Sequence, residues 1–97
     1  MPGEPRQRLD KWLFFTRAAK SRSIAAKIAQ AGRVRVNREK VDQAAYPLKL
    51  GDVLTITLER RVLVWRVVDL GSRRGPADEA RSLYEDLSPP TSQPGAG

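Results

Sequence analysis

The sequence predicts a small α+β fold, in which two N-terminal helices pack on a small, mostly antiparallel sheet and a third helix follows near the C-terminus. Apolar residues recur with the helical period over residues 8–31. After Gly32 the period changes to two, which is typical of half-buried strands. Pro76 then stands at the start of a further helical segment, a position where proline is favoured.

The chain has the length of a single domain, at 97 residues. We expect a folded domain over residues 8–70, followed by a basic turn and a C-terminal helix over residues 71–87. Residues 1–7 and 88–97 are rich in Pro and Gly and nearly devoid of apolar side chains, so we predict disordered tails there. The longest apolar runs have four residues, whereas a membrane span needs about 20, and we therefore place the chain in the cytoplasm.

The first helix is predicted from Arg8 to about Thr16. Its buried stripe follows the spacing i, i+3, i+4, i+7 and consists of Leu9, Trp12, Leu13 and Thr16. Asp10 falls in the first turn, where a carboxylate suits the positive end of the helix dipole. We assign Trp12 and Trp65 to the core and expect Phe14 to be partly buried.

The second helix is predicted from Ser21 to Ala31. Ser21 is a suitable N-cap, because its hydroxyl oxygen accepts hydrogen bonds from free backbone N–H groups. We expect its buried stripe to consist of Ile24, Ile28 and Ala31. Gly32 is a suitable stop, because helices often end with a left-handed residue.

Strands are predicted after Gly32. Residues 33–36 alternate Arg and Val, Asn37 and Arg38 stand where a tight turn is expected, and a short return strand begins at Lys40. Residues 46–52 form a predicted loop. The segments 53–58 and 62–70 are rich in β-branched residues and are expected to pair as a hairpin. The third helix is predicted from Ala77 to about Leu87, docked through Leu83, Tyr84 and Leu87.

The charge of the chain is uneven. Eighteen Lys and Arg residues against 11 Asp and Glu residues give a net charge of +7, and the excess lies in residues 1–50. A basic region on a small domain attracts polyanions, with nucleic acid as the first candidate and an anionic membrane surface as the second. A charge that serves solubility alone is the alternative.

Catalysis is poorly supported by the sequence. The absence of His and Cys removes the commonest general base, thiol catalysis and the commonest zinc ligands. The adjacent carboxylate pairs Asp78/Glu79 and Glu85/Asp86 lie at the two ends of one predicted surface helix. No loop gathers carboxylates for a hard cation, and no Gly-rich loop is suited to a phosphate cofactor. We therefore expect a non-enzymatic protein with no cofactor and no metal.

The basic residues between Arg8 and Arg38 form the best candidate site. Nine cations fall in these 31 residues, and Asp10 is the only acidic residue among them. Arginines grip phosphates bidentately, and a helix N-terminus such as that at Ser21 favours an anion. The predicted RNA-binding residues are Arg8, Lys11, Arg17, Lys20, Ser21, Arg22, Lys27, Arg33, Arg35, Asn37 and Arg38.

An ordered set of short motifs over residues 8–58 resembles the RNA-binding fold named for small-subunit ribosomal protein S4. The motifs are Arg8-Leu9-Asp10-Lys11-Trp12-Leu13, Ser21-Arg22, Gly32-Arg33-Val34-Arg35-Val36-Asn37 and Gly51-Asp52. The resemblance implies that the two helices and the strand–turn form an RNA-contacting surface. This sequence departs from the family at Arg38, where a Gly usually follows the Asn.

The sequence also resembles the bacterial ribosome-associated heat-shock protein 15 family. The Lys11-Trp12 form of the first helix and the later segments 73–77 and 83–85 carry this resemblance. It implies binding to ribosomal RNA on free large ribosomal subunits that carry peptidyl-tRNA, in stalled-ribosome recycling during stress. Many members have a longer basic C-terminal extension, whereas this sequence ends soon after Leu87 with uncharged residues.

Two other classes of function remain open on the sequence. Two helices followed by strands are also compatible with a DNA-binding helix-turn-helix, although Arg22 is then the only strong base-reading side chain near the start of the second helix. A protein-interaction module with incidental basic charge is the other alternative. Nothing in the sequence demands more than a monomer.

Overall fold

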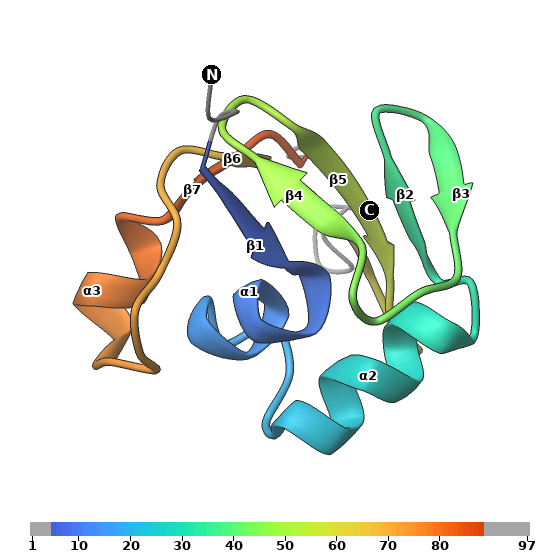
Figure 1. Cartoon of the computed structure of the whole chain (residues 1–97), viewed down its shortest axis with the longest axis horizontal. Helices are drawn as coiled ribbons and strands as arrows, with labels where there is room; N and C mark the ends of the chain where they lie inside the picture. The colour runs from blue at the N-terminus through green and yellow to red at the C-terminus, as the bar shows by residue number, and fades with distance from the viewer. Residues whose placement is uncertain (1–4, 89–97) are drawn as a thin grey trace, which may run out of the picture.

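The computed structural model describes residues 5–88 and confirms the α+β fold (Figure 1). The elements in chain order are β1 (Arg6–Arg8), α1 (Leu9–Phe15), α2 (Arg22–Gln30), β2 (Val34–Val36), β3 (Glu39–Val41), β4 (Pro47–Lys49), β5 (Val53–Thr57), β6 (Val62–Val67), α3 (Ala77–Arg81) and β7 (Tyr84–Asp86). Within these residues no helix is long and apolar enough to cross a membrane.

All paired strands are antiparallel. Five strands form one sheet in the order β3-β2-β5-β6-β7, and β1 pairs with β4 in a separate two-stranded ribbon. Helices α1 and α2 contact each other and lie along one side of the sheets, whereas α3 lies at the end away from the β2–β3 hairpin (Figure 1). The predicted pairing of the two long strands is confirmed, with Leu54 opposite Trp65 and Ile56 opposite Leu63.

The core lies between the helices and the five-stranded sheet. Alternate residues of the strands are buried, as the period of two predicts, and Val34, Val36, Leu54 and Ile56 are among them. The whole predicted stripe of α1 is buried, including Thr16, whose hydroxyl donates to the Trp12 carbonyl at 2.8 Å. Both tryptophans belong to the core, as predicted, and their rings meet edge to face at 6.4 Å.

The predicted buried stripe of α2 is only partly right, because Ile28 packs partly buried against the core while Ile24 and Ala31 do not lie on the packed face. Ala25 and Ala29 are fully buried, whereas Ile24 is 43% exposed and Ala31 is exposed. The helix is thus turned so that small side chains, which permit a close approach, face the core. The spacing of the large apolar side chains at the helical period therefore identified only in part the helix face that packs on the core.

The N-terminal segment begins its ordered structure earlier than predicted. Arg6 and Gln7 were expected in a disordered tail, but they belong to β1 and pair with Lys49 and Leu48 of β4, in a segment predicted as a loop. Gln7 also holds a distant backbone, since its amide donates to the Gly71 carbonyl at 2.6 Å and accepts from the Gly71 N–H at 3.0 Å. Residues 1–4 of the predicted tail lie outside the described residues.

The C-terminal helix is shorter than predicted. It ends at Arg81, and the chain then forms β7, which adds an edge strand to β6. The Tyr84 ring stacks on the Trp65 ring with centroids 3.7 Å apart and 10° between the planes, a contact that a continued helix would not make. Ser88, expected in the disordered tail, accepts a hydrogen bond from the Val64 N–H at 2.9 Å, and residues 89–97 lie outside the described residues.

Candidate nucleic-acid interface

A buried carboxylate organises the first group of predicted site residues. Asp10 is 3% exposed and accepts hydrogen bonds from two arginines of different elements. Arg8 donates to it from Nε and Nη2, both at 3.1 Å, and Arg22 donates from Nη2 at 3.2 Å. The Lys11 backbone N–H donates to the same carboxylate at 2.8 Å. Asp10 therefore fixes the start of α1 to the start of α2.

The two arginines remain available to solvent. The side chains of Arg8 and Arg22 are 49% and 45% exposed, so each guanidinium has a free edge while another edge rests on Asp10. Burial raises the pKa of Asp10, but its hydrogen bonds with Arg8 and Arg22 outweigh burial and leave the pKa below its usual value. The carboxylate thus stays charged and keeps both arginines in place.

The start of α2 has the predicted N-cap. Ser21 has extended backbone geometry, and its Oγ accepts from the Ile24 N–H at 3.1 Å. Its hydroxyl hydrogen is still free to donate. Lys20 immediately precedes the cap and is exposed, and no acidic residue lies in the first turn of α2. We call Arg8, Lys11, Lys20, Ser21 and Arg22 the α1–α2 cluster.

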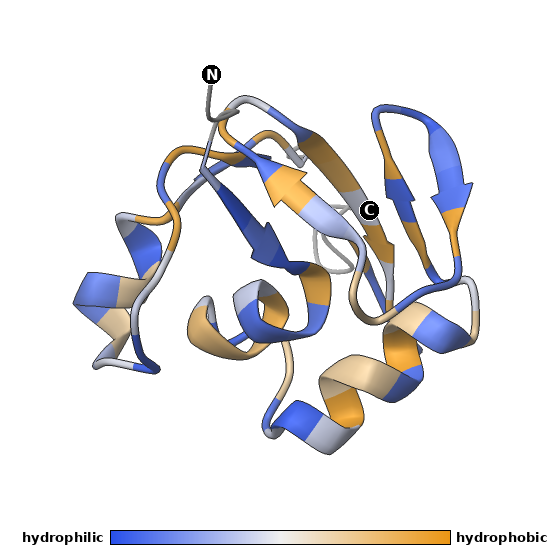
Figure 2. Cartoon of the chain, in the orientation of Figure 1, coloured by the Kyte–Doolittle hydropathy of each residue, from blue (hydrophilic) through white to orange (hydrophobic). Residues whose placement is uncertain are grey.

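The β2–β3 hairpin turn holds the second group. Asn37 and Arg38 have φ angles of 51° and 75°, as a two-residue hairpin turn with two left-handed residues requires. The flanking residues Val36 and Glu39 pair directly, so Arg38 at the usual Gly position leaves the turn intact. Figure 2 shows hydrophilic residues along much of this hairpin, and Arg38 is exposed at its tip.

Asn37 is a structural residue of this turn. Its Nδ2 donates to the Asp52 carboxylate at 3.0 Å, and its Oδ1 accepts from the Val53 N–H at 3.0 Å. Asp52 is buried and also accepts from the Lys49 N–H at 3.0 Å. Both ends of the Asn37 amide therefore have partners within the protein, namely Asp52 of the Gly51-Asp52 motif and the N–H of Val53, which follows it.

The remaining predicted residues lie apart from the α1–α2 cluster. Arg35 points to the face of the sheet opposite to buried Val34 and Val36, and hence away from the helices. Arg33 lines a shallow pocket with Ile24 and Ile28 of α2. Lys27, in the last turn of α2, is exposed.

Arg17 lies at the other end of α1. It follows the helix with a φ of 65°, and its Nε donates to the Gly75 carbonyl at 2.9 Å. The neighbouring basic turn is also engaged within the protein, because Arg73 pairs with Glu79 and Arg74 lies over the Phe14 ring at 5.0 Å. Phe14 is partly buried, as predicted.

Sequence reasoning missed two carboxylates that position the site. Asp10 was assigned only to the helix dipole, and Asp52 only to a turn. The signal was present as fixed motifs that contain both residues, but only the fold brings Asp10 to Arg22 and Asp52 to Asn37.

Three of the four carboxylates weighed for catalysis form surface ion pairs. Asp78 and Glu79 pair with Arg81 and Arg73, and Glu85 pairs with Arg66. Over residues 5–88 no group of three or more His, Cys, Asp or Glu side chains could hold a metal ion.

Comparison with known proteins identifies the family of this fold. Residues 7–54 match the S4 domain. The chain is 36% identical over 87 residues to heat shock protein 15 of Escherichia coli, over 84% of this chain and 60% of that protein. It is 31% identical over 81 residues to the RQC P-site tRNA stabilizing factor of Streptococcus pneumoniae, over 84% of this chain and 90% of that protein.

A solved structure agrees with these sequence matches. The trimeric structure of Vibrio cholerae heat shock protein 15 is similar with a TM-score of 0.79 and 26% identity, over 90% of this chain and 85% of that chain. The chain spans about 60% of the length of the Escherichia coli relative. The matched S4 segment contains both the α1–α2 cluster and the β2–β3 turn.

Proposed function

The chain belongs to the S4-domain family that includes heat shock protein 15 and the RQC P-site tRNA stabilizing factors, and on that premise we propose that it is a non-catalytic RNA-binding protein of the large ribosomal subunit. The observation that carries the proposal is the pair of half-exposed arginines held on buried Asp10 at the start of α2. This arrangement presents fixed guanidinium donors beside a helix N-terminus, and both favour a phosphate.

RNA phosphates are the ligands that this surface fits best. Arg8 and Arg22 each keep unused N–H donors. Lys11, Lys20 and Ser21 lie close to these arginines in the sequence and add further donors. Phosphate contacts position a protein on RNA without reading its sequence. A structured ribosomal RNA would therefore be recognised through its backbone and shape, because its base edges lie in a deep major groove.

The names of the relatives indicate a more specific RNA partner. One group is named for stabilizing P-site tRNA and the other for heat shock. We propose that this chain binds ribosomal RNA of free large subunits that carry peptidyl-tRNA, in stalled-ribosome recycling during stress. Arg38 would add a phosphate contact from the hairpin tip, whereas Asn37 would hold the turn rather than touch RNA.

The test compares two arginine variants in binding to purified large subunits. Arg22→Ala removes a proposed phosphate contact, and Arg66→Ala makes the same charge change at an exposed surface pair with Glu85. We expect Arg22→Ala to weaken binding about tenfold, which corresponds to about 1.4 kcal/mol for a charge-assisted hydrogen bond. Arg66→Ala should change the affinity less than about twofold, because exposed pairs contribute little.

The salt dependence distinguishes phosphate contact from other roles of Arg22. If about five phosphates are contacted, the log–log slope of affinity against salt should be roughly −3 to −5, and Arg22→Ala should reduce it by about one. Equal weakening by both variants, or an unchanged slope, contradicts the proposal. Competition by duplex DNA as strong as by structured RNA would favour the helix-turn-helix alternative.

A further inference from the structure

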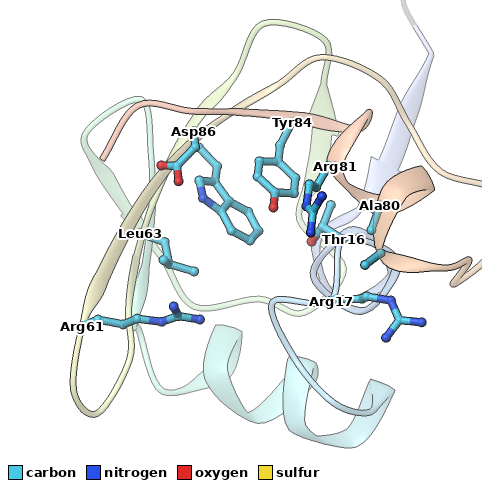
Figure 3. A pocket seen from close by; sticks show the side chains of 10 residues that line it. Thr16, Arg17, Arg61, Leu63, Ala80, Arg81, Tyr84 and Asp86 are labelled. Atoms are coloured by element: carbon cyan, nitrogen blue, oxygen red, sulfur yellow. The ribbon is translucent and has the colours of Figure 1, made fainter. Parts of the chain in front are cut away.

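A pocket of about 260 Å³ lies at the end of α1 opposite to the α1–α2 cluster. Residues from the end of α1, the β5–β6 turn, β6, α3 and β7 line this open pocket (Figure 3). Eight of its ten lining residues, with Arg61, Arg81 and Tyr84 among them, come from outside the segment that matches the S4 domain. The pocket is therefore a feature separate from the proposed S4-type surface.

The charged groups of this pocket are arranged for an anion. The Arg61 and Arg81 guanidiniums and the Tyr84 hydroxyl point toward the pocket, whereas the Asp86 carboxylate and the Arg17 guanidinium point away from its centre (Figure 3). Arg81 has only a long, exposed contact with Asp78 at 3.5 Å. For Arg61, no ion pair is formed within residues 5–88. Both arginines thus retain donors for a ligand.

The pKa of Tyr84 agrees with this arrangement. Burial and the Asp86 carboxylate raise the pKa of the Tyr84 hydroxyl, and Arg81 and Arg61 act in the opposite direction. Both arginines therefore lie near enough to influence the hydroxyl electrostatically.

Aromatic and apolar side chains also line the pocket. Trp65 and Tyr84 are stacked there, and Leu63 adds an aliphatic surface. Trp65 is 6% exposed, and its buried indole N–H has no acceptor among the described residues.

We propose that this pocket binds one nucleotide unit of RNA, with the phosphate on Arg61, Arg81 and the Tyr84 hydroxyl and the base against the Trp65–Tyr84 wall. Pockets for drug-sized ligands have volumes from about 300 Å³ upward, so this smaller pocket suits a single nucleotide better than a larger ligand. Combined arginine and aromatic walls are typical of sites that hold unpaired nucleotides. Helix α1 has seven residues, or a length of about 10 Å, so one RNA strand could reach both the pocket and the α1–α2 cluster.

The two tryptophan indoles provide a readout for this proposal. In the ¹⁵N-labelled full chain, UMP should shift the Trp65 indole N–H resonance saturably. The Trp12 indole N–H is an internal reference, because it already donates to the Asp69 carbonyl at 3.0 Å. We expect inorganic phosphate to bind at least about fivefold more weakly than UMP, since it lacks a base.

Adjacent arginines provide the matched variants. Arg61→Ala should weaken UMP binding about tenfold, whereas Arg60→Ala, the same charge change at the neighbouring exposed residue, should change it less than about twofold. Tyr84→Phe keeps the aromatic stack, removes the hydroxyl and should weaken UMP binding about threefold. The indole spectrum of each unliganded variant shows whether the fold is retained.

Four outcomes would overturn the proposal. The first is no saturable shift up to about 10 mM UMP, and the second is equal weakening by Arg60→Ala and Arg61→Ala. The third is tighter binding of an acidic tetrapeptide than of UMP, which would assign the pocket to a protein partner. A 5′-phosphorylated tetrauridine should bind more tightly than UMP through further phosphates, and equal affinity would assign the pocket to free nucleotides instead.

Discussion

The start of α2 and the β2–β3 turn both depend on a buried aspartate, but the two carboxylates hold different things. Asp10 holds the charged side chains of Arg8 and Arg22, while Asp52 holds the Asn37 amide and the backbone of its own loop. One region therefore positions two arginines of the proposed RNA-binding surface, and the other positions a turn. The difference implies that loss of Asp10 acts mainly on binding, whereas loss of Asp52 acts mainly on stability.

Asp52→Ala should produce the largest change in stability. It leaves the Asn37 amide and the Lys49 N–H without their buried acceptor, which costs about 2–3 kcal/mol of the free energy of unfolding. In a domain of this size the melting temperature should fall on the order of 10 °C. Urea unfolding measures the change, and Asp42→Ala, at an exposed carboxylate, is the control. A loss of less than about 1 kcal/mol would refute the assigned role of Asp52.

Asp10→Asn should weaken RNA binding although it makes the protein more basic. Asparagine keeps the size of Asp10 but loses the charge that holds both guanidiniums, so we expect about tenfold weaker binding to large subunits. Asp42→Asn adds the same positive charge at an exposed site and should bind equally or slightly more tightly. If both variants bind more tightly than the unmodified protein, net charge alone governs affinity and the positioning role of Asp10 is wrong.

The stability of the α1–α2 contact should depend on pH in the acid range. The folded-state pKa of Asp10 lies below its usual value of about 3.9, so its stabilising effect is complete above the unfolded pKa and is lost as the pH falls through the folded pKa. The stability difference between the unmodified protein and Asp10→Asn should be constant above about pH 5 and shrink below about pH 4. Urea unfolding at a series of pH values measures this, and a difference independent of pH down to about 2 would contradict the ion pair.

Arg38→Gly should have the smallest effect and separates the strain of the turn from its charge. The φ of 75° at Arg38 suits Gly, so the variant should be about 0.5–1 kcal/mol more stable. Arg38→Ala removes the same charge but keeps the strain and should not gain stability. If Arg38 contacts a phosphate, both variants reduce the salt slope by about one. Equal stability of the two variants would show that the turn is not strained.

The elements with strong local patterns were predictable from the sequence. The stripe of α1, the Ser21 cap and the β5–β6 pairing all rest on periodicity or capping chemistry over neighbouring residues. β1, β4 and β7 were missed because each has only three residues and forms through a partner distant in the sequence. The face of α2 was only partly predicted, because close packing buries Ala25 and Ala29 completely and leaves Ile24 exposed, whereas Ile28 is partly buried.

The S4-type motifs were predictable from the sequence, whereas the arrangement of the predicted site residues in space was not. The fold brings Arg8, Arg22 and Ser21 together, yet it places Arg17 at the far end of α1 and Arg35 on the other face of the sheet. Periodicity places a residue on a face of its own element only. Which faces of different elements meet depends on tertiary packing, and this is why the role of Asp10 was visible only in the structure.

The most direct test of the central claim is sedimentation of the purified chain with separated large and small ribosomal subunits, at low and moderate salt. The proposed function predicts co-migration with the large subunit, weakened at moderate salt, and no comparable binding to the small subunit. Absence from both subunits, with binding retained to free RNA or DNA, would contradict the ribosomal role and leave a general nucleic-acid-binding protein.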